Sequence, residues 1–508
     1  MTNVCSLAAA PWQISTDSPI LLGIVGGVVG FVLLLFVLTK VPLSYNVLNL
    51  AVRWKTALLT AFAFTLVVCV QTVFLAFING MYAMTESSGH PGNVMIMAEG
   101  ATDEAFSSLA FADATDLETQ EGVLRENGQP LVSRETYLNA VQTLPDPPPG
   151  RPRRRFLQVR GVEIPELSAR VHSMKLGAGG SWFSEAGVRA IGKQGETAIE
   201  VVLGAGIARE LGADRHAKEL ATAKNRNQLE IGDTFDIGGR LWFVTGIMEQ
   251  TGSLYDSEVW TKQSQIGPLF GKPNYSTFVL RADPNFRKDQ RETFLTAKKQ
   301  KSQADYDQAV ALKKEDPSAP TPIKQEIKTP KNDDAWGAEL VRDYFANEYT
   351  KAQINPQVET TYFSNMSATN MQFLIATIVL SLIMSLGGIF GVMNTMFAAI
   401  SQRTKDIGVL RLLGYKRWQI LVSFLLESIV LSIVGGLIGC AIGSLCDGLT
   451  ASSIVSGAGG GGKSVVLRMT VDASTLTMGM LLSILMGFLG GLIPSLSAMR
   501  LTALEALR

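Results

Sequence analysis

Five long apolar runs limit the folds that are open to this 508-residue chain. A helix rises about 1.5 Å per residue, so about 20 apolar residues cross the hydrocarbon core of a bilayer. Charged residues make up only 18% of the chain, whereas roughly 25% is typical of soluble proteins. The sequence therefore predicts an α-helical membrane protein. The runs cover residues 20–39, 57–78, 372–397, 420–446 and 475–498.

The first run, at 20–39, resembles a signal peptide in position. However, no Lys or Arg precedes it, its apolar core is long and Lys40 follows it. Each of these features is typical of a retained membrane helix. We therefore expect an extra transmembrane helix here, after an N-terminal tail at 1–19. The four later runs are then the core transmembrane helices 1 to 4.

Basic residues set the expected orientation, because Lys and Arg concentrate in cytoplasmic loops. The amphipathic segment 40–56 and the bend 398–419 both carry more Lys and Arg than acids. We expect these segments on the cytoplasmic side, together with the tail 499–508. Alternation of the spans then places the polar region 80–368 and the Gly-rich loop 447–474 on the outer side.

The stretch GAGGGGKS, from Gly457 to Ser464, matches the phosphate-binding pattern GxxxxGK[ST]. Such a loop must lead into a helix whose N-terminus holds the phosphates. Here SVVLRMTVD follows, and it alternates like a short strand. The stretch also lies on the expected outer side, away from cytoplasmic ATP. We interpret the match as accidental, the segment as a flexible loop, and the chain as having no catalytic residues.

The polar region between the first and second core spans is expected to fold as a large α+β domain. Residues 199–249 predict a strand, a short helix and a hairpin, with Gly238 and Gly239 at the turn. Between 284 and 335 the composition changes. The first half of this insertion is typical of a charged helix and the second half of a Pro- and Lys-rich linker. We interpret it as a solvated insertion, with a partner-binding arm as the alternative.

Two classes of site have no support in the composition. The net charge is zero, so no basic field favours nucleic acid as a partner. His90, His172 and His216 lack Cys or acidic neighbours at metal-ligand spacing. We therefore expect no metal site and interpret each histidine as a surface or packing residue.

The bend 398–419 contains a short amphipathic stretch between charged flanks. Such a stretch suits docking into a groove of another protein, and the alternative is a helix that lies on lipid headgroups. Its apolar residues are Ile407, Val409, Leu410, Leu412 and Leu413.

Polar and small residues inside the last spans are further candidates. Glu427 lies within the run 420–446, where a carboxylate is costly and is a functional candidate by default. It either snorkels to the cytoplasmic face or pairs with a basic residue of the bend. Glycines at four-residue spacing let helix backbones approach closely, in packing or in dimerisation. They are Gly435, Gly439 and Gly443, and Gly487 and Gly491.

The C-terminal third resembles the FtsX-like permease family. The resemblance is carried by QRTKDIGVLRLLGYKRWQI, the acid-bearing span, the glycine repeat and the ending GGLIPSLSAMRLTALEALR. The outer segments VVLGAGIARELG and IGDTFDIGGRLWFVTGIMEQTGSLYDSEVW are similar to the MacB-like periplasmic core domain. Together these stretches extend the resemblance to most of the chain.

The resemblance implies a permease subunit of an ABC transporter of the MacB or lipoprotein-release type in the bacterial inner membrane. A separate cytoplasmic ATPase, carrying ATP and Mg, would drive it, and the permease would bind no cofactor itself. Motion of the spans would move the outer domain (mechanotransmission) for export or extraction of a substrate. The family contact with the ATPase maps onto Asp406, Ile407, Gly408, Leu410, Arg411, Leu413 and Gly414.

The resemblance leaves several partners and one other function open. A homodimer and a heterodimer of paralogous permeases both fit, and a periplasmic adaptor and membrane lipids are further expected partners. Drugs, peptides, lipids and lipoproteins are all compatible substrates. An FtsX-like signal transducer that controls outer cell-wall hydrolases without transport is the alternative function. Two departures are that Asp406 stands where many members have Glu, and that the insertion 284–335 has no match in the family.

Overall fold

The computed structural model describes residues 30, 52, 54–144, 153–191, 195–215, 220, 223–316, 318, 327, 329–366, 368–456 and 462–500. The expected extra helix at 20–39 lies outside these residues apart from Gly30, as do the tail 1–19 and most of the segment 40–56. The chain divides into two compact units. One is an α/β domain that includes the described residues of 81–370 and 450–467, and the other is a helical unit that includes the described residues of 7–80, 371–449 and 468–508.

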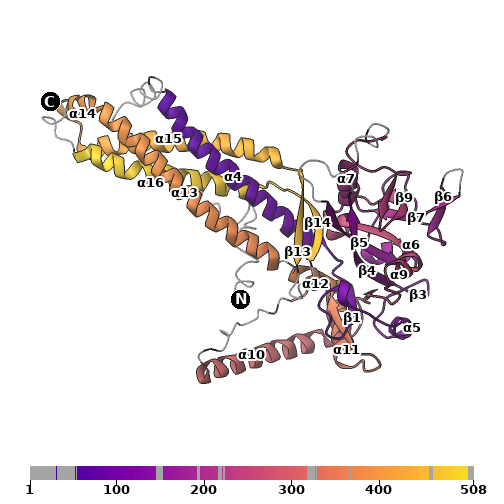
Figure 1. Ribbon diagram of the computed structural model, residues 1–508. Coiled ribbons are helices and arrows are strands. Elements are labelled where there is room, and N and C mark those ends of the chain that lie inside the picture. The colour runs from indigo at the N-terminus through magenta and orange to yellow at the C-terminus, as the bar shows by residue number, and fades with distance from the viewer. Residues whose placement is uncertain are drawn as a thin grey trace. The chain divides into compact units, whose positions relative to one another are not determined.

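Four helices in the described part of the chain are long and apolar enough to cross a membrane. Three of the predicted core spans each lie inside one of them, the span 420–446 covers most of the third helix and the turn after it, and the four lie side by side in Figure 1. The short helix α14 (Thr404–Leu412) connects the second and third. The four helices are α4 (Trp54–Ser87), α13 (Ala368–Gln402), α15 (Arg417–Gly443) and α16 (Ala473–Arg500).

The repeated glycines lie where these helices approach most closely. A Cβ atom added at Gly435 would come within 2.5 Å of the carbonyl oxygen of Ala61, and one at Gly439 within 2.8 Å of that of Thr65. Gly443 faces Thr72 in the same way. These three glycines therefore bring α15 against α4. Gly487 and Gly491 similarly face Ser432 and Ser428, and bring α16 against α15.

One mixed sheet forms the centre of the α/β domain. Its strand order is β12-β1-β11-β4-β5-β10-β7-β9-β8, with β6 paired to β7. The β5–β10 and β7–β9 pairs are parallel, and the other pairs in the sheet are antiparallel. The bounds are β1 (Asn93–Ala98), β4 (Val132–Thr143), β5 (Arg154–Val162), β6 (Val188–Ile191), β7 (Glu196–Leu203), β8 (Thr234–Ile237), β9 (Arg240–Ile247), β10 (Glu258–Lys262), β11 (Thr277–Arg281) and β12 (Ile354–Val358).

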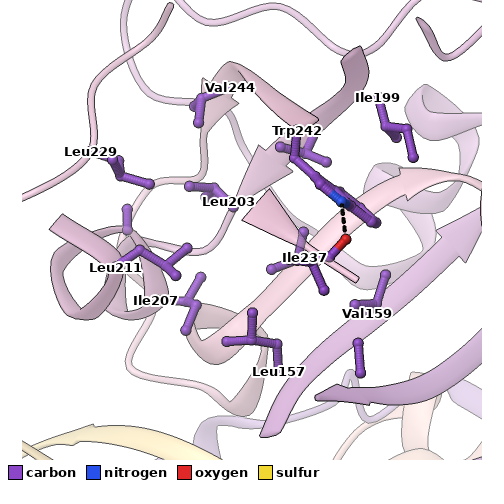
Figure 2. Packing of buried hydrophobic residues seen from close by; sticks show 14 of the residues in the cluster. Leu157, Val159, Ile199, Leu203, Ile207, Leu211, Leu229, Ile237, Trp242 and Val244 are labelled. Carbon is purple, nitrogen blue, oxygen red and sulfur yellow. Dashed lines mark hydrogen bonds between the residues drawn. The ribbon is translucent and has the colours of Figure 1, made fainter. Parts of the chain in front are cut away.

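The strand, helix and hairpin predicted at 199–249 are confirmed as β7, α7 (Ala205–Ala213) and the β8–β9 pair. Gly238 and Gly239 connect β8 to β9 with φ angles of 63° and 73°, which glycine adopts without a steric penalty. Figure 2 shows the core that these elements share. The Trp242 side chain is fully buried there, and its indole N–H donates to the Ile237 carbonyl oxygen at 3.2 Å.

Short helices surround the sheet, and one long helix lies in the predicted insertion. That helix, α10 (Arg291–Glu315), is charged and has no buried residue, as predicted, whereas most of the linker after it lies outside the described residues. Lys298 of α10 pairs with Glu339 of α11 at 2.8 Å. The other helices are α5 (Phe111–Thr119), α6 (Pro165–His172), α9 (Gln263–Leu269), α11 (Asp333–Asn347) and α12 (Glu359–Asn365), with the 3-10 turns η1 (Glu104–Phe106), η2 (Leu254–Ser257), η3 (Lys288–Gln290) and η4 (Ser444–Cys446).

The segment 447–474 contains the short strand expected from SVVLRMTVD and a second strand before the glycines. These two strands, β13 (Thr450–Ser456) and β14 (Gly462–Arg468), pair with each other. Another small pair, β2–β3 (Arg125–Glu126 and Gln129–Pro130), lies elsewhere in the α/β domain. Val465 and Leu467 are buried. Burial of such apolar side chains stabilises the strand.

Candidate functional site

The helix α14 presents an apolar surface at its end. Val409, Leu412 and Leu413 are 48%, 66% and 71% exposed. Gly414 follows with φ of 92°, a left-handed conformation that terminates helices. Its amide donates to the Arg411 carbonyl oxygen at 3.2 Å. The turn therefore fixes the exposed leucines on a defined surface.

The structure divides the seven residues expected to contact an ATPase. Ile407 and Gly408 are buried within the helical unit, and Ile407 belongs to its apolar core. Those two face inward in this chain, and the ATPase contact of the seven residues stays a prediction. The exposed Leu412 and Val409 were absent from the predicted set. The remaining five are exposed or half-buried: Asp406, Leu410, Arg411, Leu413 and Gly414.

A buried ion pair connects the bend to the third span. Arg403, directly before α14, donates from Nη1 to Glu427 Oε2 at 2.9 Å, and from Nη2 to Oε1 at 3.4 Å. The two side chains are 5% and 7% exposed. Of the two alternatives for Glu427, the structure shows pairing with the bend. A paired carboxylate avoids much of the cost of an isolated buried charge.

The centre of the α/β sheet holds a second set of buried charges. Arg160 of β5 is fully buried and surrounded by carboxylates from a neighbouring strand on each side and from η1. Its Nε and Nη2 both donate to Glu258 at 2.7 Å, in the bidentate geometry that makes Arg–carboxylate pairs strong. Its Nη1 donates to Glu104 at 2.9 Å and also contacts Glu135.

His172, the last residue of α6, extends these contacts to the start of α12. Its Nε2 lies 2.5 Å from Glu135 Oε1, and its Nδ1 lies 3.0 Å from Glu359 Oε1. The Tyr255 hydroxyl also donates to Glu359 Oε1, at 2.6 Å. We call Glu104, Glu135, Arg160, His172, Glu258 and Glu359 the charge cluster; all six are buried.

Mutual attraction keeps members of the charge cluster ionised. Burial alone would lower the pKa of His172, but Glu135 and Glu359 outweigh it and raise that pKa to about 10. Burial would likewise raise the pKa of Glu359, and the charged His172 instead lowers it to about 2. Burial also opposes the charge on Arg160, yet three carboxylates hold its pKa well above the usual value. His172, Glu359 and Arg160 are therefore charged at neutral pH.

Sequence reasoning missed the whole charge cluster. His172 was interpreted as a surface or packing residue, whereas both of its ring nitrogens face carboxylates. A usable signal was present, because Arg160 stands between Val159 and Val162 in β5, and Glu258 precedes Val259 and Trp260 in β10. Charged residues are rarely fully buried unless they are paired. In the described ranges, no group of three or more His, Cys, Asp and Glu side chains is arranged to hold a metal ion.

The phosphate-loop match has a different structural setting from a nucleotide site. Gly462, Lys463 and Ser464 open the strand β14, and the next helix, α16, begins only at Ala473. Residues 457–461 lie outside the described residues. A phosphate loop needs a helix N-terminus directly after the glycines, and a strand stands there instead.

Comparison with known proteins identifies both parts of the chain. Residues 57–312 match the family model of the MacB-like periplasmic core domain, and residues 378–503 match that of the FtsX-like permease C-terminal domain. The uncharacterised ABC transporter permease YknZ of Bacillus subtilis (strain 168) is 32% identical over 171 residues, which are 34% of this chain and 40% of the relative. The macrolide export ATP-binding/permease protein MacB of Bdellovibrio bacteriovorus is 35% identical over 144 residues, 28% of this chain and 20% of the relative.

These alignments span less than half the length of either relative. The crystal structure of the periplasmic region of MacB from Actinobacillus actinomycetemcomitans aligns with 52% of this chain and 96% of its own, at 13% identity and a TM-score of 0.27. A TM-score this low carries no argument about the fold. The two family models match the chain, and its four apolar helices precede and follow the α/β domain in the sequence. The chain belongs to the family that combines a MacB-like periplasmic core domain with an FtsX-like permease C-terminal domain.

Proposed function

We propose that this permease couples ATP hydrolysis by a cytoplasmic ATPase on a separate chain to motion of its periplasmic domain, for export or extraction of a substrate. It works in the bacterial inner membrane, with α14 on the cytoplasmic side. ATP and Mg bind to the ATPase, and the permease transmits force. A second permease chain, an adaptor protein and membrane lipids are the further partners that this assignment includes.

The observation that carries the proposal is the apolar end of α14. Leu412 and Leu413 are exposed, and such residues on a short helix suit a groove in a partner protein. The other side of α14 is fixed, since Ile407 packs in the helical core and Arg403 pairs with Glu427 of α15. A push on the exposed leucines would therefore reach α15 rather than only bend a loop.

The test replaces both leucines, Leu412→Asp and Leu413→Asp, in one chain. We expect this variant to lose co-purification with the ATPase, because two charges would enter an apolar groove. Leu312→Asp is the matched control, since Leu312 of α10 is also an exposed leucine on a helix, at 54%. Co-purification of the double variant at the wild-type level would refute docking at α14.

A further inference from the structure

The segment Thr251–Ser257, which we call the junction segment, leads into strand β10 at the centre of the sheet. It contacts the end of α4 first. The Ser87 hydroxyl donates to the Gly252 carbonyl oxygen at 2.9 Å, and the Leu254 amide donates to the Ser88 hydroxyl at 2.8 Å. Ser88 is fully buried. The chain that leaves the first span is thus bonded to the junction segment.

The junction segment also contacts the chain that leads into the second span. The Tyr255 hydroxyl donates to Glu359 of α12 at 2.6 Å, and the Tyr255 ring packs edge-on against Phe363 with centroids 5.8 Å apart. Glu359 in turn accepts from the His90 amide at 2.7 Å and the Asn93 side chain at 2.8 Å. One carboxylate therefore joins the residues after α4 to those before α13.

The third contact is with the strands between the third and fourth spans. The Val466 amide of β14 donates to the Ser257 hydroxyl at 2.8 Å, and both residues are buried. Gly206 of α7 allows this approach, because a Cβ added there would lie 3.2 Å from Val466 Cβ and 2.9 Å from the Asp256 carbonyl oxygen.

The junction segment has internal bonds that make it stiff. The Asp256 carboxylate accepts from the Thr251 amide at 3.1 Å and from the Gly252 amide at 2.7 Å. Directly after it, Glu258 holds the buried Arg160. The three contacts are therefore attached to the charge cluster through a few residues of continuous backbone.

We infer that the junction segment and Glu359 form one cooperative junction, which fastens all three membrane connections of the periplasmic domain to its central sheet. Residues in such a unit open together rather than one by one. Tyr255, Ser257 and Glu359 are its positioning residues. Its role in receiving motion from the spans rests on the proposed function, whereas its cooperativity does not.

Hydrogen exchange of the full chain in lipid nanodiscs tests this inference. The amides of His90, Leu254 and Val466 each donate across one of the three contacts. Ser257→Ala removes the acceptor of Val466 only. We expect the amides of His90 and Leu254 to exchange about tenfold faster as well, because a buried donor left unsatisfied weakens the whole unit.

Ser276→Ala is the matched control. Ser276 is also fully buried, and its hydroxyl accepts from the Tyr137 amide at 2.9 Å inside the sheet. We expect faster exchange near Tyr137 and unchanged exchange at the three reporter amides. Faster exchange confined to Val466 in Ser257→Ala would overturn the inference.

A second variant keeps the test decisive if Ser257→Ala unfolds the domain. Tyr255→Phe removes one hydroxyl and leaves the ring against Phe363. We expect faster exchange at Val466, which lies across a different contact. Unchanged exchange there would also overturn the inference. The experiment contains no ATPase, so its failure leaves docking at α14 intact, and a failure of docking leaves the junction intact.

Discussion

Arg403 and Glu427 show how single residues fix the bend. Removing one partner of a buried ion pair leaves an uncompensated charge, which costs about 3–5 kcal/mol. We therefore expect Glu427→Leu to lower the free energy of unfolding of the helical unit by about 3 kcal/mol or more. The double variant Arg403→Met, Glu427→Leu should recover most of the loss. Unfolding in detergent measures both, and equal losses in the single and double variants would contradict this account.

His172 gives the periplasmic domain a pH dependence. The folded pKa is about 10 and the ordinary value is 6.5, so the folded state keeps a proton that the unfolded state releases. The stabilisation is complete below pH 6.5 and is lost as the pH rises through 10. Between these values we expect the free energy of unfolding to fall by ~1.4 kcal/mol per pH unit.

Thermal unfolding of the full chain between pH 6 and pH 10, roughly the window of this linkage, measures this decline. The His172→Asn variant supplies the reference, because it retains every other titrating group. The difference in stability between wild type and variant should shrink steadily as the pH rises. A constant difference would show that His172 is neutral in the folded protein.

At the scale of residues, the sequence predicted which side chains are functional candidates better than it predicted the residues that they contact. Glu427 was identifiable because a carboxylate stands out in an apolar run. Its pairing with the bend was one of two alternatives. The charge cluster was not identified, since its contacts join residues as distant in sequence as Arg160 and Glu258. Only the strand order brings such residues together.

At the scale of elements, close helix packing depends on individual glycines. We expect Gly439→Ala to destabilise the helical unit by about 1–3 kcal/mol, because the new methyl group would press on the α4 backbone at Thr65. Gly387→Ala on α13 is the control, since no heavy atom lies within 4 Å of its Cβ position. That control should be neutral or slightly stabilising. Thermal unfolding in nanodiscs distinguishes the two, and equal effects would contradict the packing.

Helices and local hairpins were predictable because their signals are local. Apolar length predicted the four spans, and paired glycines predicted the turn at Gly238 and Gly239. The alternation of SVVLRMTVD predicted part of the strand β14, whereas β13 was interpreted as part of a flexible loop. The burial of Val466 in β14 involves contacts with sequence-distant residues such as Ser257, and no local pattern records these.

At the scale of the whole molecule, we propose that a partner protein hydrolyses the ATP. We therefore expect Lys463→Ala, which alters the phosphate-loop match, to leave ATP turnover of the purified complex unchanged. Radiolabelled phosphate release measures the turnover. Loss of turnover or of nucleotide binding in this variant would place the ATP-hydrolysing site on this chain.

We propose that force passes from α14 to the periplasmic domain. Pulsed electron paramagnetic resonance tests it directly. The spin labels are attached to Asn139→Cys on β4 and Leu445→Cys in η4, two exposed positions. The four native cysteines are first replaced, so that only these two sites are labelled. In complex with the ATPase, the distance distribution between the labels should shift when ATP and vanadate are added, and Leu412→Asp with Leu413→Asp should abolish the shift. An unchanged distribution in the wild-type complex after ATP and vanadate are added, with ATP hydrolysis confirmed before vanadate is added, would contradict the claim.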